Sequence, residues 1–560
     1  MPQNCDFKRT WKDIKCGVDV HWMQSGWGQR RAGIWNLGWG CGMGWLTGEE
    51  LGFARAIGRL NGMNPFLPAR LECEREALGA DFEPEPDSYW GQTSGQVDRR
   101  RPNLLKLSAR ATQVADRLRQ QLDQGATPSA DELALYDGLV TYLLFYDLYP
   151  CWGPGGEGLG DANGSTDARA WRVFEDRFQH WHHRAGRDFP SIAERVRLFE
   201  LFHQVYRAFF QIFNCVVGQS QPAAALRARI WQSIFTHDFQ RYRRGLGAVL
   251  DQVTTLVTGP SGSGKELVAR AIGLSRPIPF DTTHRRFAAR PEELYRAVNI
   301  SALARGVVES ELFGHARGAF TGATGARVGW LETCGPHGAL LLDEIGELDA
   351  TTQVKLLRVL QNRQFQRLGE TQDREFQGKI IVATNRDLRR EIAQGRFRED
   401  LYYRLCADVV ETPSLATQLH DNPAVLEQLA EHLARRLVPG EARPLADEVV
   451  AFVRREIPRD YPWPGNIREL EQCVRNVLIC GRYVPQPAGQ AQPAGNWPPE
   501  IEAVAREFAG LELTADELLR RYCQHAYRQT GSFERAARLL QLDRRTVRAK
   551  VDRPEGDATP

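Results

Sequence analysis

The sequence predicts a multidomain chain with a helical N-terminal region, a central α/β domain and a small all-helical domain near its C-terminal end. With 560 residues, the chain is too long to fold around one hydrophobic core. Between about residues 230 and 480, short β-rich runs alternate with helical segments, which favours a parallel sheet with crossover helices. A Pro- and Gly-rich stretch, 484–506, then separates this part from a basic helical segment.

The composition is that of a globular chain. The hydrophobic share is 42%, the charged share is 25% and the formal net charge is +2. A chain so close to neutrality has no overall basic field, so any contact with nucleic acid must be local. The most apolar stretch, 139–149, has about 11 residues, whereas a membrane-spanning helix needs roughly 20. It predicts a buried helix and no membrane association.

The cysteines favour a reducing, cytoplasmic location. The eleven cysteines include no CxxC pair, and the chain does not begin with the apolar run of a signal peptide. Cys5, Cys16 and Cys41 match no zinc-binding spacing. We interpret them as free thiols and assign no metal to them.

The N-terminal part divides into an unassigned segment and a helical region. Residues 1–42 are rich in Trp and Gly and have neither helical nor strand periodicity. The pattern changes at Met43, which gives the hypothesis that translation starts there. Thr47 and Glu50 then form a candidate capping box at the start of a helical region that we expect to extend from 43 to 225.

A second capping box, Ser191 with Glu194, opens the clearest helix of this region. Apolar and mostly aromatic residues then recur every three or four positions. We interpret this stripe as the core-facing side of a helix, while a ligand pocket or a subunit contact stays open as the alternative. The stripe consists of Ile192, Val196, Phe199, Phe202, Tyr206, Phe209 and Phe213.

A glycine-rich segment between a β-rich run and a helical run predicts a phosphate-binding P-loop. Glycines allow backbone N–H groups to surround phosphate oxygens, and Lys265 adds a positive charge beside the β- and γ-phosphates of ATP. Glu266 stands where a general P-loop has a Ser or Thr for Mg²⁺. The predicted ATP-binding residues are Gly259, Pro260, Ser261, Gly262, Ser263, Gly264, Lys265 and Glu266.

Two further β-rich runs end in polar residues suited to ATP hydrolysis. Asp343 and Glu344 follow an apolar run, so we expect Asp343 to hold Mg²⁺ and Glu344 to polarise the attacking water. Adjacent carboxylates are otherwise a common solvated surface pair. Thr384 and Asn385 end the next run and would sense the γ-phosphate or position water, although this signal alone is weak.

Two arginines six positions apart, Arg398 and Arg404, are candidates for arginine fingers. An arginine offered to the γ-phosphate in a neighbouring subunit accelerates hydrolysis by ~10³ to 10⁵. Surface or salt-bridged arginines are the alternative interpretation.

The C-terminal segment predicts a helix-turn-helix. Ser532 and Asp543 are candidate caps of two short helices, and a preceding helix, 515–528, would serve pairing. Basic residues on the second helix suit contacts with base edges and phosphates, whereas a helical hairpin with a solvated basic face is the alternative. The candidate DNA-binding residues are Arg544, Arg545, Thr546, Arg548 and Lys550.

The segment ESELFGHARGAFTGA resembles the NtrC-like sigma-54 activators of the AAA+ ATPase superfamily, and the similarity covers roughly residues 230 to 480. The resemblance implies that a loop contacts sigma-54 and moves with the nucleotide state, with Phe320 and Thr321 as contact residues. Without it, the loop would read as a glycine-rich turn between helices. The predicted loop residues are Gly318, Ala319, Phe320, Thr321, Gly322 and Ala323.

The resemblance also implies roles for single residues. The family commonly has Glu at the position of Glu266. It uses Arg398 and Arg404 as fingers in trans, Arg468 as the sensor II arginine and Asn299 to hold the water-polarising Glu344 in an inactive pose.

Departures from the family pattern affect the start of the α/β domain, the lid and the C-terminal domain. The approach to the P-loop, residues 235–252, lacks the usual glycine-containing entry, so the sequence does not define where the domain begins to within ten residues. Residues 412–418 lack the charges usual after the fingers, so the resemblance supports the coupling of the lid less strongly than the nucleotide site. The C-terminal segment is similar to a Fis-type domain, with Gln541 in place of the usual turn glycine.

As a whole, the resemblance implies a transcription activator that binds double-stranded DNA upstream of a promoter and remodels sigma-54 RNA polymerase as a homo-oligomer, in the family's hexameric form. The alternatives are a DNA-binding repressor with a non-productive nucleotide site and an AAA+ remodelling chaperone. The inducing signal is not evident. The expected units are an extension (1–42), a helical regulatory domain (43–225), an α/β AAA+ domain (226–412), its helical lid (413–483), a linker (484–506) and a helix-turn-helix domain (507–560).

Overall fold

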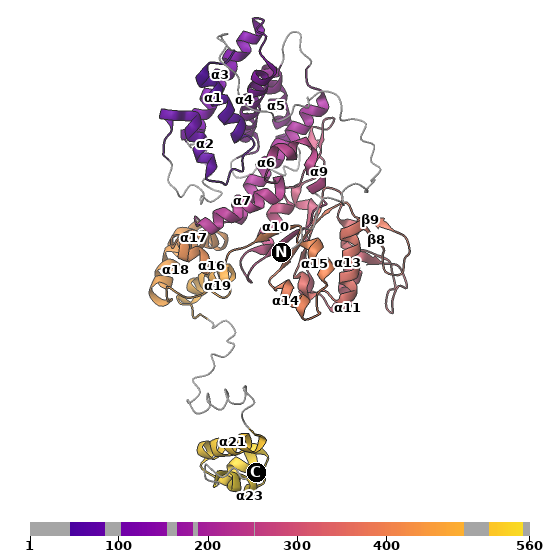
Figure 1. Ribbon diagram of the computed structural model, residues 1–560, viewed down its shortest axis with the longest axis vertical. Coiled ribbons are helices and arrows are strands. Elements are labelled where there is room, and N and C mark those ends of the chain that lie inside the picture. The colour runs from indigo at the N-terminus through magenta and orange to yellow at the C-terminus, as the bar shows by residue number, and fades with distance from the viewer. Residues whose placement is uncertain are drawn as a thin grey trace, which may run out of the picture.

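The computed structural model describes residues 45–84, 102–153, 165–182, 189–250, 252–485 and 514–552 (Figure 1). The predictions for residues 1–42, for Cys5, Cys16 and Cys41 and for a start at Met43 lie outside these residues, as does nearly all of the predicted linker. Within the described ranges, no helix is long and apolar enough to cross a membrane.

The central domain contains a five-stranded parallel sheet, which confirms the α/β prediction. The strands lie in the order β11-β1-β10-β7-β4. Since all five are parallel, their carboxyl ends meet at one edge, where open α/β sheets bind their ligands. The strands are β1 (Thr255–Thr258), β4 (Tyr295–Asn299), β7 (Ala339–Asp343), β10 (Lys379–Thr384) and β11 (Asp408–Glu411).

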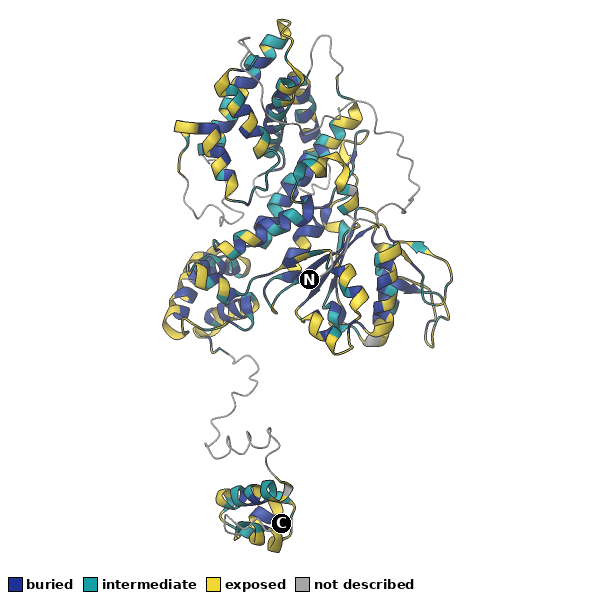
Figure 2. Ribbon diagram, viewed as in Figure 1, coloured by how far each residue is buried: buried dark blue, intermediate teal, exposed yellow. Residues whose placement is uncertain are grey.

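Alternate residues of the strands pack into two separate hydrophobic layers, one on each face of the sheet. Val257 of β1 joins the layer that contains helix α10, while Leu256 joins the layer on the opposite face. Figure 2 shows the buried residues along the strands and the inner helix faces. The helices of this domain are α10 (Lys265–Gly273), α11 (Arg305–Phe313), α12 (Trp330–Thr333), α13 (Ala350–Asn362), α14 (Leu388–Ala393) and α15 (Glu399–Leu405).

Three two-stranded antiparallel pairs accompany the main sheet. They are β2 (Phe280–Asp281) with β3 (Arg286–Phe287), β5 (Gly314–His315) with β6 (Arg327–Val328), and β8 (Gln364–Phe365) with β9 (Arg374–Glu375).

Four helices with their own hydrophobic cluster follow the sheet. Leu415, Leu470 and Trp463 belong to this cluster. Hydrogen bonds from the start of α19, described below, connect the four helices to the carboxyl edge of the sheet. The helices are α16 (Leu415–Asp421), α17 (Val425–Leu437), α18 (Ala442–Glu456) and α19 (Asn466–Cys480).

The N-terminal part is helical, and both predicted capping boxes are present, at Thr47 with Glu50 and at Ser191 with Glu194. A third, Ser129 with Glu132, starts α4. The helices are α1 (Gly48–Leu60), α2 (Ala69–Leu78), α3 (Pro102–Asp123), α4 (Ala130–Leu148), α5 (Ser165–His182), α6 (Ile192–Cys215) and α7 (Gln221–Phe235), with α8 (Phe239–Arg241) and α9 (Gly247–Leu250) leading to β1.

The aromatic stripe of α6 faces the interior, as predicted, except that Ile192 at its first turn is 55% exposed. The stripe is shared between two clusters. Phe199 and Phe202 pack among the N-terminal helices, whereas Phe213 packs with α7 and the sheet. Helix α6 therefore belongs to both parts of the molecule.

The predicted boundary between residues 225 and 226 falls inside α7. Trp231 and Phe235 on this helix are buried in the same cluster as Val257 of β1 and Val410 of β11. The sequence approach to the P-loop lacks a recognisable start signal, and only this packing shows that α7 covers the sheet.

The C-terminal residues form three short helices around a small core of Cys523, Ala536 and Val547, among others. Gln541, between the last two helices, has φ 52°, the left-handed conformation that glycine adopts most readily. This conformation explains why a glycine is usual there. The helices are α21 (Ala515–Thr530), α22 (Phe533–Leu540) and α23 (Arg544–Val551).

Candidate nucleotide site

The predicted P-loop connects the end of β1 to the start of α10, at the carboxyl edge of the sheet. Gly259, Gly262 and Gly264 all have positive φ, at 138°, 74° and 93°. A Cβ on Gly259 would lie 2.1 Å from Thr412 Oγ1, and one on Gly262 would lie 2.2 Å from the Gly465 carbonyl oxygen. Both the backbone conformation and the closeness of these neighbours therefore require glycine.

Lys265 is the first residue of α10 and is largely buried. Its Nζ donates hydrogen bonds of 3.1 Å to the carbonyl oxygens of Gly259 and Pro260. Burial lowers the pKa of Lys265, while the nearby charges of Glu344 and Asp343 raise it. The ammonium group thus lies inside the loop whose N–H groups would surround a phosphate. Glu266 is exposed in the first turn of the helix.

The predicted acidic pair lies at the end of β7. Asp343 is its last residue, and Glu344 has φ 57°, a left-handed conformation that is strained for a non-glycine residue. Burial raises the pKa of both carboxyl groups, and Lys265 opposes this effect. Partly desolvated carboxylates beside a lysine favour a bound cation or an exchangeable proton.

Thr384 and Asn385 follow on the adjacent strand, where β10 pairs with β7 in the register Ala383 to Asp343. The Asn385 backbone N–H donates to Glu344 Oε2 over 3.4 Å. The buried Thr384 hydroxyl accepts a hydrogen bond of 3.1 Å from the Arg386 N–H. Parallel pairing therefore brings together residues that are about 40 positions apart in the sequence.

Asn299 differs from the pairing that the resemblance implies. Its side-chain Nδ2 donates to Asp343 Oδ2 over 3.1 Å, whereas the hydrogen bond to Glu344 comes from Asn385. The reason is the register of the sheet, because Asn299 at the end of β4 lies directly opposite Asp343.

The donor set suits Mg²⁺. The described residues contain no cluster of three or more His, Cys, Asp or Glu side chains that would enclose a metal. Mg²⁺ is typically held by one or two carboxylates together with substrate phosphates and water. Asp343, with Glu344 next to it, meets this requirement beside the P-loop.

The four-helix lid contacts the P-loop through residues at the start of α19. Asn466 Nδ2 donates to the Ser261 carbonyl oxygen over 2.8 Å, and the Ile467 N–H donates to that of Gly262 over 3.1 Å. The predicted sensor residue, Arg468, lies beside them, with Nη1 3.5 Å from Ser261 Oγ.

The segment after β11 also joins the P-loop to the lid, although it lacks the charges usual in the family. The Thr412 hydroxyl lies 2.6 Å from Ser263 Oγ, and the Leu415 N–H donates to Asn466 Oδ1 over 2.8 Å. Hydrogen bonds between uncharged groups therefore connect the P-loop to the lid in this segment. Sequence reasoning missed Thr412 and Asn466, and the only local signal was the Trp-Pro-Gly run before α19.

We predict that Gly262→Ala destabilises the protein by about 1–3 kcal/mol, because the new methyl group meets the Gly465 carbonyl oxygen and the positive φ is strained. The affinity for a fluorescent ATP analogue should also fall, since the loop and the lid must separate. Thermal unfolding and a binding titration measure the two effects. Gly306→Ala is the matched control, because a Cβ there has no neighbour within 4 Å; equal behaviour of the two variants would contradict the prediction.

The two candidate finger arginines lie at the start and near the end of α15, and both are exposed. Arg398 precedes the helix and forms an ion pair of 2.7 Å with Asp400. Within the described residues, the Arg404 side chain forms no hydrogen bond or ion pair. Neither arginine side chain contacts the P-loop of its own chain in that part of the structure. Both side chains thus lie at the surface, Arg398 paired with Asp400 and Arg404 directed to solvent.

The predicted contact loop lies between the short strands β5 and β6, rather than between helices. A hydrogen bond of 2.8 Å from the Gly318 N–H to the Ala323 carbonyl oxygen closes it. Gly318 and Gly322 have positive φ, and Phe320 is 46% exposed, with its ring centroid 5.0 Å from that of His315. The loop therefore presents an aromatic side chain to solvent.

The candidate DNA-binding residues are not equally available on α23. Arg544, Arg545 and Thr546 are exposed, and Arg548 is exposed with its guanidinium over the Phe533 ring. Lys550 differs, because it forms an ion pair with Asp516 of α21 and its side chain is only 17% exposed. Lys550 therefore connects two helices.

Comparison with known proteins identifies the domain that carries this site. Residues 237–411 match the family model described as "Sigma-54 interaction domain". This segment of the chain is therefore similar to sigma-54 interaction domains. The match, together with the parallel sheet, confirms the predicted AAA+ α/β domain and the resemblance on which it was based.

Three regulatory proteins match about half of the chain. The transcriptional regulatory protein ZraR of Escherichia coli K12 is 38% identical over 54% of the chain and 64% of its own length. The Nif-specific regulatory protein of Azotobacter vinelandii is 37% identical over 53% of each. The transcriptional regulatory protein GlrR of Escherichia coli K12 is 39% identical over 48% of the chain and 57% of its length. The chain thus spans between 53% and 64% of these relatives.

Over larger parts of the chain, a crystal structure of NtrX from Brucella abortus aligns with 25% identity and a TM-score of 0.37, covering 70% of the chain and 80% of NtrX.

Proposed function

We propose that this protein is a sigma-54-dependent transcription activator that uses ATP hydrolysis to remodel sigma-54 RNA polymerase. The observation that carries the proposal is the combination, within the segment that matches the sigma-54 interaction domain, of a glycine-rich loop suited to phosphate and a second loop, Gly318–Ala323, in which Phe320 and Thr321 are exposed while Ala323 is buried. ZraR and GlrR, which match about half of the chain, are transcriptional regulatory proteins.

Hydrolysis requires three functions at the carboxyl edge of the sheet. The P-loop and Lys265 would bind the phosphates, and Asp343 would hold Mg²⁺, which supplies positive charge to the phosphate oxygens. Glu344 orients and polarises the attacking water. Its half-buried position and its raised pKa suit a group that accepts a proton.

An oligomer would complete the site. Arg398 and Arg404 are exposed on α15 and do not contact the P-loop of their own chain among the described residues. An arginine from a neighbouring subunit would supply positive charge to the γ-phosphate. We therefore propose a homo-oligomeric ring, a hexamer by resemblance to the family.

The lid would transmit the nucleotide state. Arg468 and Asn466 reach the P-loop from α19, so a change at the phosphates alters contacts on which the position of the lid depends. Movement of Gly318–Ala323 against sigma-54 would then open the promoter.

The proposal predicts that Thr321→Ala separates the two activities. ATP hydrolysis should be unchanged, because the loop is remote from the P-loop in the sequence and has no hydrogen bond to it among the described residues. Promoter opening should fall at least about tenfold, the effect of losing ~1.4 kcal/mol of contact with sigma-54. Opening is measured with purified sigma-54 RNA polymerase on a supercoiled template, and the exposed Thr371→Ala serves as the control.

Two results would defeat the proposal: promoter opening that is equally efficient with a different sigma factor, or opening by the wild-type protein without ATP hydrolysis. Loss of ATPase activity in Thr321→Ala would instead contradict the separation of roles.

We further propose that α22 and α23 form a helix-turn-helix that binds DNA upstream of the promoter. Exposed Arg544, Arg545 and Arg548 would contact phosphates and base edges, and α21 would pair two copies. Because Lys550 is engaged with Asp516, we assign it to the packing of these helices and not to the DNA contact.

We predict that Arg544→Ala weakens binding of the full chain to a random-sequence duplex and lowers its salt dependence, with a log–log slope smaller by about 1. The physical reason is the loss of one phosphate-neutralising charge. Fluorescence anisotropy at several salt concentrations measures it. Arg538→Ala on α22 is the control, since this exposed arginine lies on the other helix; an equal loss in both variants would argue for a general charge effect.

A further inference from the structure

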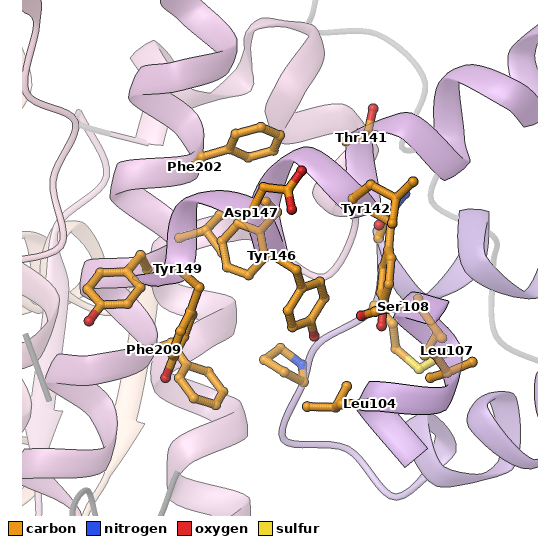
Figure 3. A pocket seen from close by; sticks show the side chains of 18 of the residues that line it. Leu104, Leu107, Ser108, Thr141, Tyr142, Tyr146, Asp147, Tyr149, Phe202 and Phe209 are labelled. Carbon is orange, nitrogen blue, oxygen red and sulfur yellow. The ribbon is translucent and has the colours of Figure 1, made fainter. Parts of the chain in front are cut away.

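A cavity of about 420 Å³ lies among the N-terminal helices, between α3, α4 and α6. Its volume is within the range of small-molecule sites, which is roughly 300–1,000 Å³. Figure 3 shows Tyr142 and Tyr146 extending from α4 toward the same space, with Leu104 and Ser108 on one side and Phe209 on the other. Aromatic and aliphatic side chains make up most of the wall.

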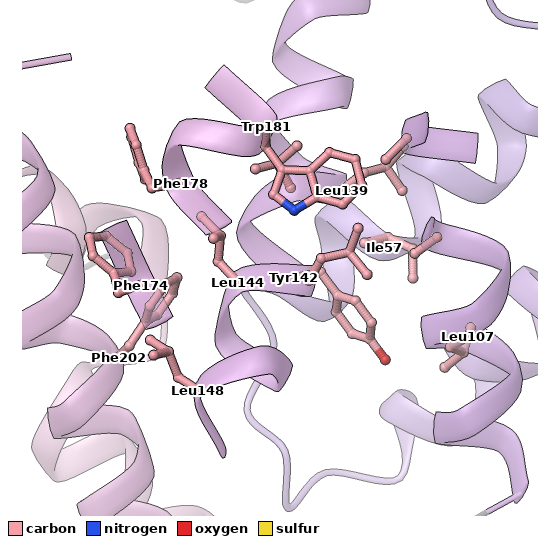
Figure 4. Close-up of a cluster of buried hydrophobic side chains, with 14 of the residues drawn as sticks. Ile57, Leu107, Leu139, Tyr142, Leu144, Leu148, Phe174, Phe178, Trp181 and Phe202 are labelled. Atoms are coloured by element: carbon pink, nitrogen blue, oxygen red, sulfur yellow. The ribbon is translucent and has the colours of Figure 1, made fainter. Parts of the chain in front are cut away.

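One wall of this cavity is held in place by a closely packed core. On the other side of α4, Leu144 and Leu148 are completely buried, together with Phe174 of α5 (Figure 4). A helix that is anchored in this way keeps its cavity-facing residues in position without a ligand. The cavity is thus preformed, as most small-molecule sites are.

A polar group in this apolar wall points to a specific ligand. The Tyr142 side chain is 5% exposed, and its hydroxyl forms no hydrogen bond of normal geometry with the described residues, although the Ser108 hydroxyl lies near it. Burial raises the pKa of Tyr142 well above its usual value, so the phenol stays neutral. A buried hydroxyl without a well-formed hydrogen bond is costly, and a ligand atom would compensate for this cost.

The charges at the wall favour a neutral ligand. Arg70 forms an ion pair of 2.8 Å with Glu74, and Asp147 pairs with Arg177 over 3.2 Å. Arg243 also lines the cavity and is exposed to solvent, although partial burial of its guanidinium and the neighbouring Arg244 lower its pKa. The interior therefore matches aromatic rings that carry a single hydrogen-bonding group.

Helix α6 connects this cavity to the nucleotide site. Phe202 and Phe209 line the cavity, while Gln204 and Arg207 turn to the end of α10. The Gln204 amide donates to the Ser275 carbonyl oxygen over 2.9 Å, and Arg207 donates to those of Leu274, over 2.7 Å, and Arg276.

Helix α10 begins with Lys265 of the P-loop. The hydrogen bonds from α6 are made at the opposite, C-terminal end of this helix. If a ligand binds more tightly when α6 is in one position than in another, its binding favours that position. Because α6 is hydrogen-bonded to the end of α10, the position of α10 would shift with it.

We propose that the cavity binds a neutral aromatic small molecule with one hydroxyl or similar group, and that its binding changes the rate of ATP hydrolysis through α6 and α10. The second half of this proposal rests on the ATPase function proposed above. The first half, ligand binding, does not depend on it.

Binding is tested with N-phenyl-1-naphthylamine, a neutral aromatic probe whose fluorescence rises in apolar surroundings, added to the full chain. Saturable binding is expected, with displacement by 2-naphthol more effective than by 2-naphthoate or by laurate. Absence of saturable binding would overturn the proposal. More effective displacement by 2-naphthoate would overturn the neutral class, and more effective displacement by laurate would overturn the aromatic class.

Two variants fill the cavity from opposite walls. Val205→Trp on α6 and Leu104→Trp on α3 should each weaken probe binding at least about tenfold, because the space for the ligand is lost. Ile192→Trp is the matched control, since Ile192 lies on α6 but is exposed and does not line the cavity. Thermal unfolding identifies a variant that does not fold, in which case the other carries the test. Unchanged binding in a folded variant would overturn the site.

The connection to the nucleotide site is tested with Gln204→Met, which keeps the size of the side chain but removes its hydrogen bonds to Ser275 and Tyr242. The variant should bind the probe as the wild type does, while the probe no longer changes its ATPase rate. If the wild type binds the probe but its ATPase rate does not respond, the relay through α6 is wrong. If the wild type binds the probe but hydrolyses no ATP, the proposed function fails and the ligand site stands.

Discussion

Glu344→Gln is expected to reduce ATP hydrolysis by about 10²- to 10⁴-fold, the usual contribution of a positioned general base. The amide keeps the size of the side chain and the hydrogen bond from the Asn385 N–H, but it cannot accept a proton from water. Nucleotide affinity should stay close to that of the wild type, because the P-loop and Lys265 are unchanged. The variant should therefore retain ATP.

Steady-state phosphate release and a binding titration with a fluorescent ATP analogue separate these two effects. Glu375→Gln, an exposed position on β9, is the matched control and should hydrolyse ATP normally. Undiminished turnover in Glu344→Gln would remove the assignment of Glu344 and, with it, the mechanism proposed for this site.

Arg404→Ala should reduce ATP hydrolysis by ~10³ or more, in the range known for arginine fingers, without loss of nucleotide binding. Arg404 is exposed and has no recorded ion pair among the described residues, so its removal should not destabilise its own subunit. Arg459→Ala provides a control at another exposed position. Circular dichroism and oligomer mass, measured together, confirm that the assembly is intact.

A mixing experiment distinguishes action in trans from action within one chain. Arg404→Ala subunits keep Glu344, and Glu344→Gln subunits keep Arg404. In mixed oligomers, some interfaces would therefore contain both functional groups, and ATPase activity should partly recover. No recovery after subunit exchange would show that Arg404 does not act across the interface.

The chemistry of the nucleotide site could be predicted from the sequence because each of its parts is local. A strand that ends in a glycine-rich loop and a helix defines the P-loop, and an apolar strand that ends in Asp343 and Glu344 defines the acidic pair. Backbone conformation and strand period act over a few residues, so both features can be read directly from the order of the amino acids.

The contacts between these parts could not be predicted in the same way. Asn466 reaches the Ser261 carbonyl from 205 positions away, and Asn299 pairs with Asp343 because of the register of β4 and β7. The burial of Lys550 against Asp516 likewise depends on how α21 crosses α23. No local pattern specifies such distances.

The sequence by itself therefore determined the α/β class, the glycine-rich loop between β1 and α10, the acidic pair at the end of β7 and the capped starts of α1 and α6. Only the tertiary structure decided where α7 belongs, which residues join the lid to the P-loop and that aromatic side chains of α4 and α6 surround a cavity. The physical reason is that propensity and short motifs act along the chain, whereas packing and strand register depend on residues that meet only after folding.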